Sequence, residues 1–253
     1  LSPARLQRVR IPRAAQLIVS IAQPAYLPWL GYFHRIAVSD LHISLNHVDI
    51  GHRSFANRNK VLTNNGPTWL TVPLLTKGDA STDIDKVRIA ADPKWRKKHW
   101  STIEQSYRAA PHLSDHADWL RSLYDEDWQL LEDLTKVMTV GHLERLGIET
   151  EIVRSSELEP TETKSALILE LCIKVGASVY LSGPFGREYL DLTAFESAGI
   201  RVAFHDYAHP EYPQHQGGDF VPYMAAIDAL LNCGPDTRSI LASGNPGRED
   251  YLG

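Results

Sequence analysis

Three histidines fall within eleven residues of this chain, at His205, His209 and His215. A metal site is one interpretation, but an irregular segment that contains prolines does not fix the tetrahedral ligand geometry that such a site needs. General acid or base catalysis is favoured, because the pKa of histidine lies near neutral pH. We choose His209 as the base, since His205 belongs to a predicted strand. The sequence therefore predicts neither a metal nor a cofactor.

A carboxylate on an apolar helix face could serve that base. A helix is predicted over residues 221–234, and Asp228 is embedded in its apolar stripe. A carboxylate in such a position must be paired or hydrogen-bonded. Asp228 could therefore orient the His209 imidazole, or it could be a structural partner for Arg58 or for a backbone amide.

Two loops that follow predicted strands could bind a ligand. In residues 23–29, QPAYLPW, the side chains of Gln23 and Tyr26 offer directional hydrogen bonds, although a rigid aromatic turn would have the same composition. Residues 182–189, SGPFGREY, form a glycine loop before a predicted helix, which suits a phosphate or carboxylate ligand, although a simple tight turn is an equally good interpretation. Neither G-x-x-x-x-G-K-[ST] nor G-x-G-x-x-G occurs, so these nucleotide-binding motifs are absent.

Two further features could take part in catalysis or binding. Asn57 and Arg58 follow the second predicted strand in a polar cluster that suits anion recognition, or that simply forms a solvated loop. Cys172 is a possible nucleophile, because a thiolate would accept an acyl group. Its position late in an apolar predicted helix favours a buried core cysteine instead.

An alternation of strands and helices positions these residues. The apolar run 17–22 is typical of a strand that is covered on both faces. Ligands bind at the carboxyl ends of strands in such sheets. The sequence predicts an α/β fold, with a Rossmann-like, mostly parallel sheet flanked by helices and a helical middle insertion at about 92–147. Further strands are predicted at 42–48, 150–156, 178–182 and 201–206, with an edge strand at 69–75, and helices at 92–107, 117–146, 164–175 and 189–198.

Composition excludes several classes of protein. The 253 residues carry 26 Lys+Arg against 31 Asp+Glu, a net charge of −5 that argues against a nucleic-acid partner. No apolar run approaches the roughly 20 residues that a membrane span requires. Two cysteines are too few for a disulfide framework, which fits a cytoplasmic location. We expect a disordered basic leader at 1–15, a single α/β domain at 16–236 and a C-terminal tail at 237–253.

Six short motifs together resemble those of the WbqC-like protein family, over most of the chain. They are QPAYLPWLGYF (23–33), NRNK (57–60), WLTVP (69–73), YLSGPFG (180–186), HPEYPQ (209–214) and IDALLNCG (227–234). The resemblance implies an α/β protein of surface-glycan or antibiotic biosynthesis that modifies a sugar or an amine by acyl or aminoacyl transfer. One departure is Asn46-His47-Val48-Asp49, which replaces a paired acidic segment of the family, and His47 could act as a base there.

The resemblance leads to a specific hypothesis for function. An acyl or aminoacyl group would pass from a thioester, with an acyl carrier protein as a possible donor, to an amino group of a small-molecule amine or amino-sugar acceptor. His209 would deprotonate the amine and Asp228 would fix its tautomer, while Gln23 and Tyr26 would hold the carbonyl or the acceptor. The predicted substrate-binding residues are Trp29, His47, Asn57, Arg58, Ser182, Gly183, Gly186, Tyr189, Tyr212 and Gln214. The alternatives are a protein that binds a nucleotide sugar through the glycine loop, and a non-catalytic biosynthetic partner.

Overall fold

The computed structural model describes residues 16–51, 54–75 and 82–252, so the predicted leader 1–15 lies outside the described residues. Its main sheet has the strand order β5-β2-β1-β6-β7, and all neighbouring strands are parallel. Val19 of β1 pairs with Leu41 on one side and with Tyr180 on the other. The α/β fold with a parallel sheet is therefore confirmed. The strands are β1 (Ile18–Ala22), β2 (Leu41–Ser44), β5 (Glu151–Arg154), β6 (Val179–Ser182) and β7 (Arg201–Phe204).

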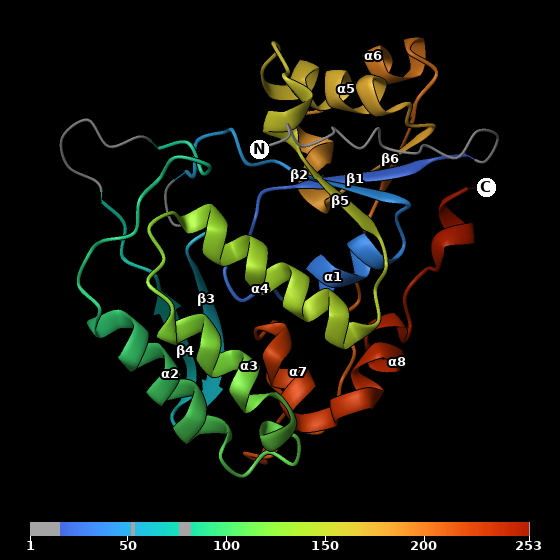
Figure 1. The fold of residues 1–253 in the computed structure, drawn as a ribbon. Coiled ribbons are helices and arrows are strands. Elements are labelled where there is room, and N and C mark those ends of the chain that lie inside the picture. Colours follow the sequence, from blue (N-terminus) through green and yellow to red (C-terminus); the bar gives the residue numbers. More distant parts are fainter. Residues whose placement is uncertain (1–15, 52–53, 76–81, 253) are drawn as a thin grey trace, which may run out of the picture.

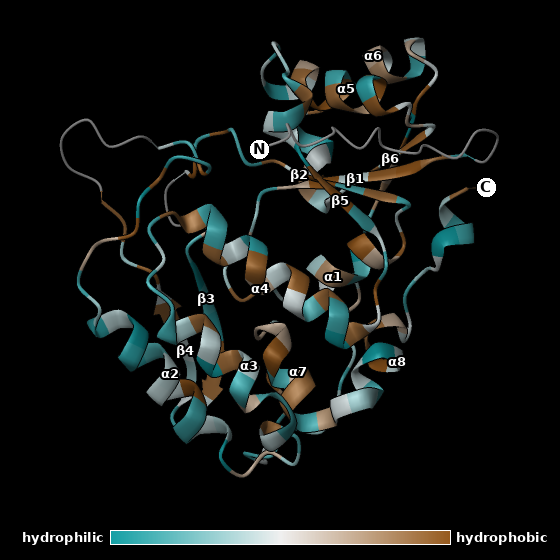
Figure 2. Cartoon of the chain, viewed as in Figure 1, coloured by the Kyte–Doolittle hydropathy of each residue, from teal (hydrophilic) through white to brown (hydrophobic). Residues whose placement is uncertain are grey.

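Helices cover both faces of this sheet (Figure 1). On one face lie α5 (Lys164–Val175) and α6 (Leu192–Ser197), and on the other lie α1 (Leu30–Ala37) and α4 (Leu131–Leu146). Val19 and Ile21 pack on the α5 side, whereas Ile18 packs on the opposite side. Because both faces are buried, β1 and β6 are largely hydrophobic (Figure 2).

A second core lies beyond α1 and α4 (Figure 1). A two-stranded antiparallel hairpin packs here with three helices, and Ile103, Leu120 and Ile227 are among the residues buried between them. These elements are β3 (Arg58–Thr63), β4 (Gly66–Thr71), α2 (Lys94–Tyr107), α3 (Leu113–Asp125) and α7 (Ala226–Cys233). The hairpin and α7 join the helical region to the sheet, so chain segments from both sides of the predicted insertion build one core.

Two predicted strands end earlier than expected. The predicted edge strand at 69–75 is wrong in its placement: β4 ends at Thr71, before Pro73, and it belongs to the separate hairpin. Proline cannot donate a ladder hydrogen bond, which ends the strand there. The predicted strand at 42–48 ends at Ser44, because the following Asn46 uses its backbone and side chain to bond Ser155 and Ser156.

Two predicted helices also differ. The predicted helix 117–146 is two helices, because Glu126 is extended and the Trp128 indole donates to the carbonyl oxygen of Leu123, folding the chain back on α3. The predicted helix 221–234 begins only at Ala226, since Tyr223 has a left-handed φ of 62°.

The C-terminal segment packs on the domain. Predicted as a tail, residues 237–252 contain α8 (Thr237–Ala242) and a final 3₁₀ turn (Arg248–Tyr251). Arg248 forms a two-point ion pair with Asp40 at 2.7 and 3.0 Å. Within the described ranges, no helix has both the length and the apolar character to cross a bilayer.

Candidate functional site

A cleft of about 680 Å³ lies at the carboxyl ends of β1, β6 and β7. Strand β2 follows β1 on one side of the sheet and β6 lies on the other, so the cleft sits where the strand order reverses. Open parallel sheets bind ligands at this position. The hairpin strand β3 and the turn before α7 complete the walls. The cleft is lined by aromatic, basic and glycine residues, which include Trp29, Tyr32, Arg35, Phe55, Lys60, Gly183, Phe185, Gly186, Tyr189, Tyr207 and Tyr223, together with Asn59 and His205.

Among the described residues, two cations and no carboxylate line this cleft. Arg35, in the last turn of α1, forms no ion pair with a described residue, and its Nε atom is buried without a hydrogen-bond partner. Lys60 of β3 lies 5.8 Å from the ring of Trp69 and also lines the cleft. A half-buried guanidinium without an anionic partner is costly in a folded protein, so the cleft is suited to an anionic ligand.

The glycine loop is shaped around Arg35. A Cβ atom at Gly183 would lie 2.6 Å from the Nη1 atom of Arg35, so only glycine lets the guanidinium approach the loop backbone here. Glycine is required at position 31 for the same reason, because a Cβ atom there would lie 2.3 Å from the indole ring of Trp29. These close approaches place a cation and an indole on neighbouring walls of one cleft.

A pair of histidines lies beside Arg35. The Nδ1 atom of His34 and the Nε2 atom of His205 are 2.8 Å apart, and both side chains are buried. Burial lowers the pKa of His34 to about 4. Burial, with the nearby Arg35 charge, lowers the pKa of His205 to about 3. Both rings are therefore neutral at pH 7, and the Nδ1 atom of His205 has no hydrogen bond to a described residue.

Exposed aromatic side chains surround the mouth of the cleft. Phe185 is 74% exposed, and Phe55, Tyr189 and Tyr223 are each more than half exposed. Tyr223 has the left-handed backbone noted above and packs against Trp29 at 5.7 Å between ring centroids. Aromatic faces held in water at the rim of a basic cleft suit a ligand with a flat or apolar portion.

Part of the predicted site lies in this cleft. Trp29, Gly183, Gly186 and Tyr189 line it, and Ser182 is buried next to them, with its hydroxyl bonded to the Gly183 carbonyl. Loops after β1 and β6 thus meet at one edge, as expected of parallel strands.

The predicted His209–Asp228 dyad does not form. Asp228 is fully buried and accepts hydrogen bonds from the hydroxyls of Tyr107 and Tyr212 and from Gln214, at 2.7 to 2.8 Å. Burial raises the pKa of Asp228, and these three donors satisfy its oxygens. The alternative partners, Arg58 or a backbone amide, are likewise not those observed. Asp228, Tyr212 and Gln214 form a structural network.

His209 lies behind a wall of the cleft. Its ring stacks on Trp29, with 12° between the planes, and contacts the edge of Tyr223. Its Nδ1 atom bonds the Pro210 carbonyl, and its Nε2 atom is buried without a partner. Burial lowers the pKa of His209. The imidazole therefore supports two cleft aromatics without reaching the cleft itself.

Tyr26 and Gln23 also lie outside the cleft. Tyr26 is fully buried, and its hydroxyl bonds His99 and Tyr124 at 2.8 Å in the second core, so it has no access to a substrate. Gln23 donates to the backbone carbonyl of Asp49. These two residues of the turn after β1 therefore have a structural role.

The other candidates occupy several places. Cys172 is fully buried in α5, where burial raises the pKa of its thiol far above the usual range, which contradicts a role as nucleophile. Asn57 bonds the Val72 carbonyl, and Arg58 begins β3 and lies over the Trp69 ring at 4.4 Å, so the expected polar loop is a strand. His47 bonds Ser155, away from the cleft.

Histidines 205, 209 and 215 do not converge. His215 bonds Asn232 and the Ser106 carbonyl, while the other two have the partners given above. No three His, Cys, Asp or Glu side chains are placed to hold a metal ion within the part of the chain that the structure describes.

Sequence reasoning missed the main cleft residues. Arg35 stands in an apolar helix as its only arginine, next to His34, and that isolated charge was the available signal. Lys60 and Tyr223 carried no such signal, because a hairpin and a left-handed turn place them.

Comparison with known proteins identifies the family of this chain. The family model for the WbqC-like protein family matches residues 23–240, which include all of the described lining residues of the cleft except Ile21. The chain belongs to the WbqC-like protein family. This WbqC-like chain is also 35% identical over 225 residues to the uncharacterized protein Rv1507c of Mycobacterium tuberculosis, covering 88% of this chain and 96% of that protein. No solved structure matches it.

Proposed function

We propose that this WbqC-like chain is a biosynthetic transferase whose cleft binds a phosphate-bearing substrate and that it passes an acyl or aminoacyl group from a thioester to a sugar-like amine. The observation that carries the proposal is Arg35, a cleft guanidinium that has no anionic partner and no neighbouring cleft carboxylate among the residues that the structure describes. Arginine binds phosphate through its planar set of donors. Lys60 adds a second positive charge.

The phosphate is common to both substrates of such a reaction. A thioester donor on coenzyme A or on a carrier protein has a phosphopantetheine arm, and a nucleotide-linked amino sugar has a diphosphate. The exposed aromatic residues at the mouth suit either of these substrates. Phe55, Phe185 and Tyr223 offer stacking faces in the same cleft as the two cations.

His205 replaces His209 as the proposed base. The amine nitrogen attacks the thioester carbonyl carbon, the nitrogen–carbon bond forms, and the carbon–sulfur bond breaks. A phosphate bound at Arg35 would offset the charge that helps to lower the pKa of His205 and so make the imidazole more basic. The Nδ1 atom of His205 then takes the amine proton and returns it to the leaving thiolate, which departs as a thiol. The neighbouring His34 would share the transient positive charge through the 2.8 Å contact.

A binding experiment tests the first part of the proposal. Isothermal titration with a coenzyme A thioester and with a nucleoside diphosphate sugar should give binding that weakens about tenfold or more in Arg35→Gln. Arg187→Gln is the matched control, because Arg187 lies on the glycine loop that borders the cleft but is paired with Asp206 at 2.6 Å. Binding that is equal in wild type and Arg35→Gln would contradict the proposal.

A turnover experiment tests the second part. Mass spectrometry of a thioester donor incubated with an amino sugar should detect an amide product with wild-type protein. Nucleotide-sugar binding without any acyl turnover would instead favour the non-catalytic alternative.

A further inference from the structure

A second cavity, of about 210 Å³, lies at the carboxyl ends of β2 and β5, against α4. It is separate from the cleft described above, and Tyr32 lines both. Because Tyr32 is 7% exposed, its ring forms a partition between the two spaces. The volume is below the roughly 300–1,000 Å³ that is usual for drug-sized ligands, so a small molecule is the expected occupant.

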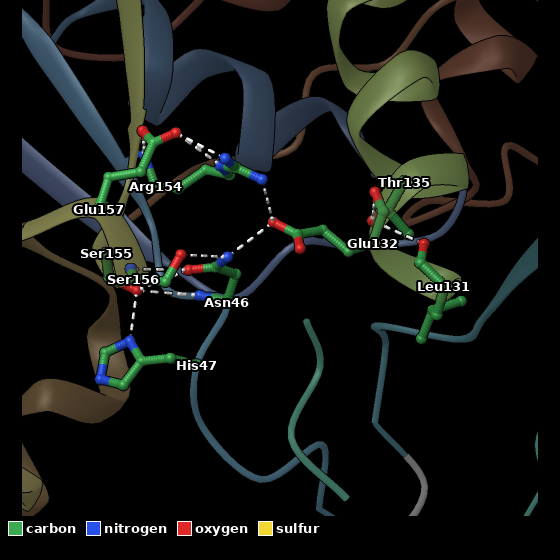
Figure 3. A network of polar contacts seen from close by, with 9 residues as sticks. All are labelled: Asn46, His47, Leu131, Glu132, Thr135, Arg154, Ser155, Ser156 and Glu157. Carbon is green, nitrogen blue, oxygen red and sulfur yellow. Dashed lines mark hydrogen bonds and ion pairs between the residues drawn. The ribbon is translucent and has the colours of Figure 1, made fainter. Parts of the chain in front are cut away.

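One carboxylate of this cavity is held in a fixed position. The side chain of Glu132 is 9% exposed, and its Oε1 atom accepts from the Asn46 amide at 2.7 Å (Figure 3). The side-chain amide of Asn46 cannot adopt the flipped orientation, because its Oδ1 atom accepts hydrogen bonds from the Ser156 backbone N–H and from the Ser155 hydroxyl. The Asn46 nitrogen must therefore face the carboxylate.

The second oxygen of this carboxylate is left free by the described residues. Oε2 of Glu132 receives no hydrogen bond from them, and in Figure 3 it carries no dashed line. Arg154 approaches only Oε1, at 3.8 Å, because it is engaged with Glu157 at 2.6 Å. Because Oε2 is not enclosed by the protein, it is open to a ligand in the cavity and can accept a hydrogen bond there.

An independent observation comes from His42. This side chain is fully buried, lines the same cavity and bonds Ser20 through Nδ1, while its Nε2 atom has no partner. Burial lowers its pKa to about 3, so the ring is neutral at pH 7 and contributes no positive charge. A polar atom that is left unsatisfied on a cavity wall again points to a missing ligand.

Two further carboxylates lie near Glu132. Burial is the largest cause of the raised pKa of Glu132; the Asn46 hydrogen bond and the Arg154 charge lower this pKa, and the carboxylates of Asp85 and Asp133 raise it. Asp85 also has a buried Oδ1 atom without a partner. The positive charge of Arg154 is largely balanced by Glu157, and Lys136 at the mouth is exposed. Apolar walls at Val140 and Ile152 accompany these polar groups.

We propose that this cavity is a second ligand site, which binds a small hydroxylated amine such as an amino sugar, with its ammonium donating to Oε2 of Glu132. The hydroxyls would meet Ser44, and the apolar face of the ring would meet Val140 and Ile152. This site is separate from the cleft in which the acceptor amine of the proposed function would react, so a cleft that failed to bind phosphate would leave the inference standing.

The test is titration of the full chain with glucosamine, with glucose as the probe that lacks only the amine. Glucosamine should bind at least about tenfold more tightly than glucose. Glu132→Gln should abolish this difference, since its Oε1 can still accept from Asn46 while the free acceptor is replaced by an NH₂ donor. Glu144→Gln, on the far end of the same helix, is the matched control, because Glu144 is exposed.

Two further variants separate the outcomes. Val140→Trp should block glucosamine by filling the cavity without altering the Glu132 network, so it serves even if Glu132→Gln fails to fold. Arg35→Gln should keep glucosamine binding, because it acts only in the other cleft. Equal binding of glucose and glucosamine, or undiminished glucosamine binding in a folded Glu132→Gln protein, would overturn the proposal.

Discussion

The Nδ1 atom of His34 and the Nε2 atom of His205 lie 2.8 Å apart beside an arginine without an ion-pair partner. One ring belongs to α1 and the other follows β7, so the contact joins segments that are 171 residues apart. This pair brings two neutral imidazoles to the edge of a basic cleft, and it leaves the second nitrogen of His205 available to a substrate.

His205→Gln should therefore separate binding from transfer. We expect the affinity for a phosphate-bearing substrate to change by less than about threefold, because Arg35 remains, while turnover falls by about 10² or more, the usual effect of removing a general base. Titration and single-turnover assays on the same preparation measure the two quantities. His112→Gln is the control, since His112 pairs with Asp115 far from the cleft. Unchanged turnover in His205→Gln would remove this residue from the mechanism.

Gly183→Ala should disturb Arg35 rather than the fold. The new methyl group would meet the guanidinium at 2.6 Å, so the arginine must move away from the loop. We expect about tenfold weaker binding of a nucleoside diphosphate sugar, from the loss of a charged hydrogen bond. Gly247→Ala is matched, because a Cβ atom there makes only an ordinary contact of 3.7 Å. Weakened binding in both variants would argue against a specific effect on Arg35.

Asp228 should matter for stability and not for catalysis. Asp228→Leu leaves the buried donors of Tyr107, Tyr212 and Gln214 unsatisfied, and each such donor costs about 1–3 kcal/mol. We expect the free energy of unfolding to fall by about 3 kcal/mol or more in urea denaturation.

Asp228→Asn should lose less than Asp228→Leu, since one oxygen still accepts. The exposed Asp219→Leu should lose almost nothing. A folded Asp228→Asn protein with turnover reduced a hundredfold would instead revive the predicted dyad.

Local sequence features predicted the parallel sheet well and the partners of Asp228 poorly. The apolar run at 17–22 predicted a buried strand, and the glycines at 182–189 predicted a loop at the end of another strand. Both β1 and the loop after β6 lie where they were expected. Asp228 was correctly expected to need partners, but those partners come from Tyr107 in α2 and from the 212–214 segment. Such long-range hydrogen bonds leave no periodic signal, so the pairing with His209 could not be tested from sequence.

Positions fixed by distant contacts were also missed. Arg35 was visible in the sequence as an isolated charge in an apolar helix, but its position in the cleft depends on Gly183, almost 150 residues later. The break between α3 and α4 depends on one indole hydrogen bond to Leu123, which helical periodicity does not report.

Buried neutral histidines should make the protein sensitive to mild acid. Burial is the largest cause of the lowered pKa in each of these five residues: His34, His99 and His142, with pKa values of about 4, and His42 and His205, with values of about 3. Between the unfolded pKa near 6.5 and these folded values, the unfolded chain binds more protons, so stability is full above about pH 6.5 and falls as the pH is lowered.

Urea denaturation at pH 7.5, 6.0 and 5.0 measures this loss, in a window that lies above the titration of most carboxylates. Each neutral histidine contributes a loss of up to about 1.4 kcal/mol per pH unit once its unfolded form is protonated. His99→Gln should reduce the slope, because it removes one of these groups while keeping a partner for the Tyr26 hydroxyl. Stability that stays constant or rises from pH 6.5 to 5.0 would contradict this expectation. It would show that the buried histidine rings accept protons in the folded protein, and that the His34–His205 pair is charged.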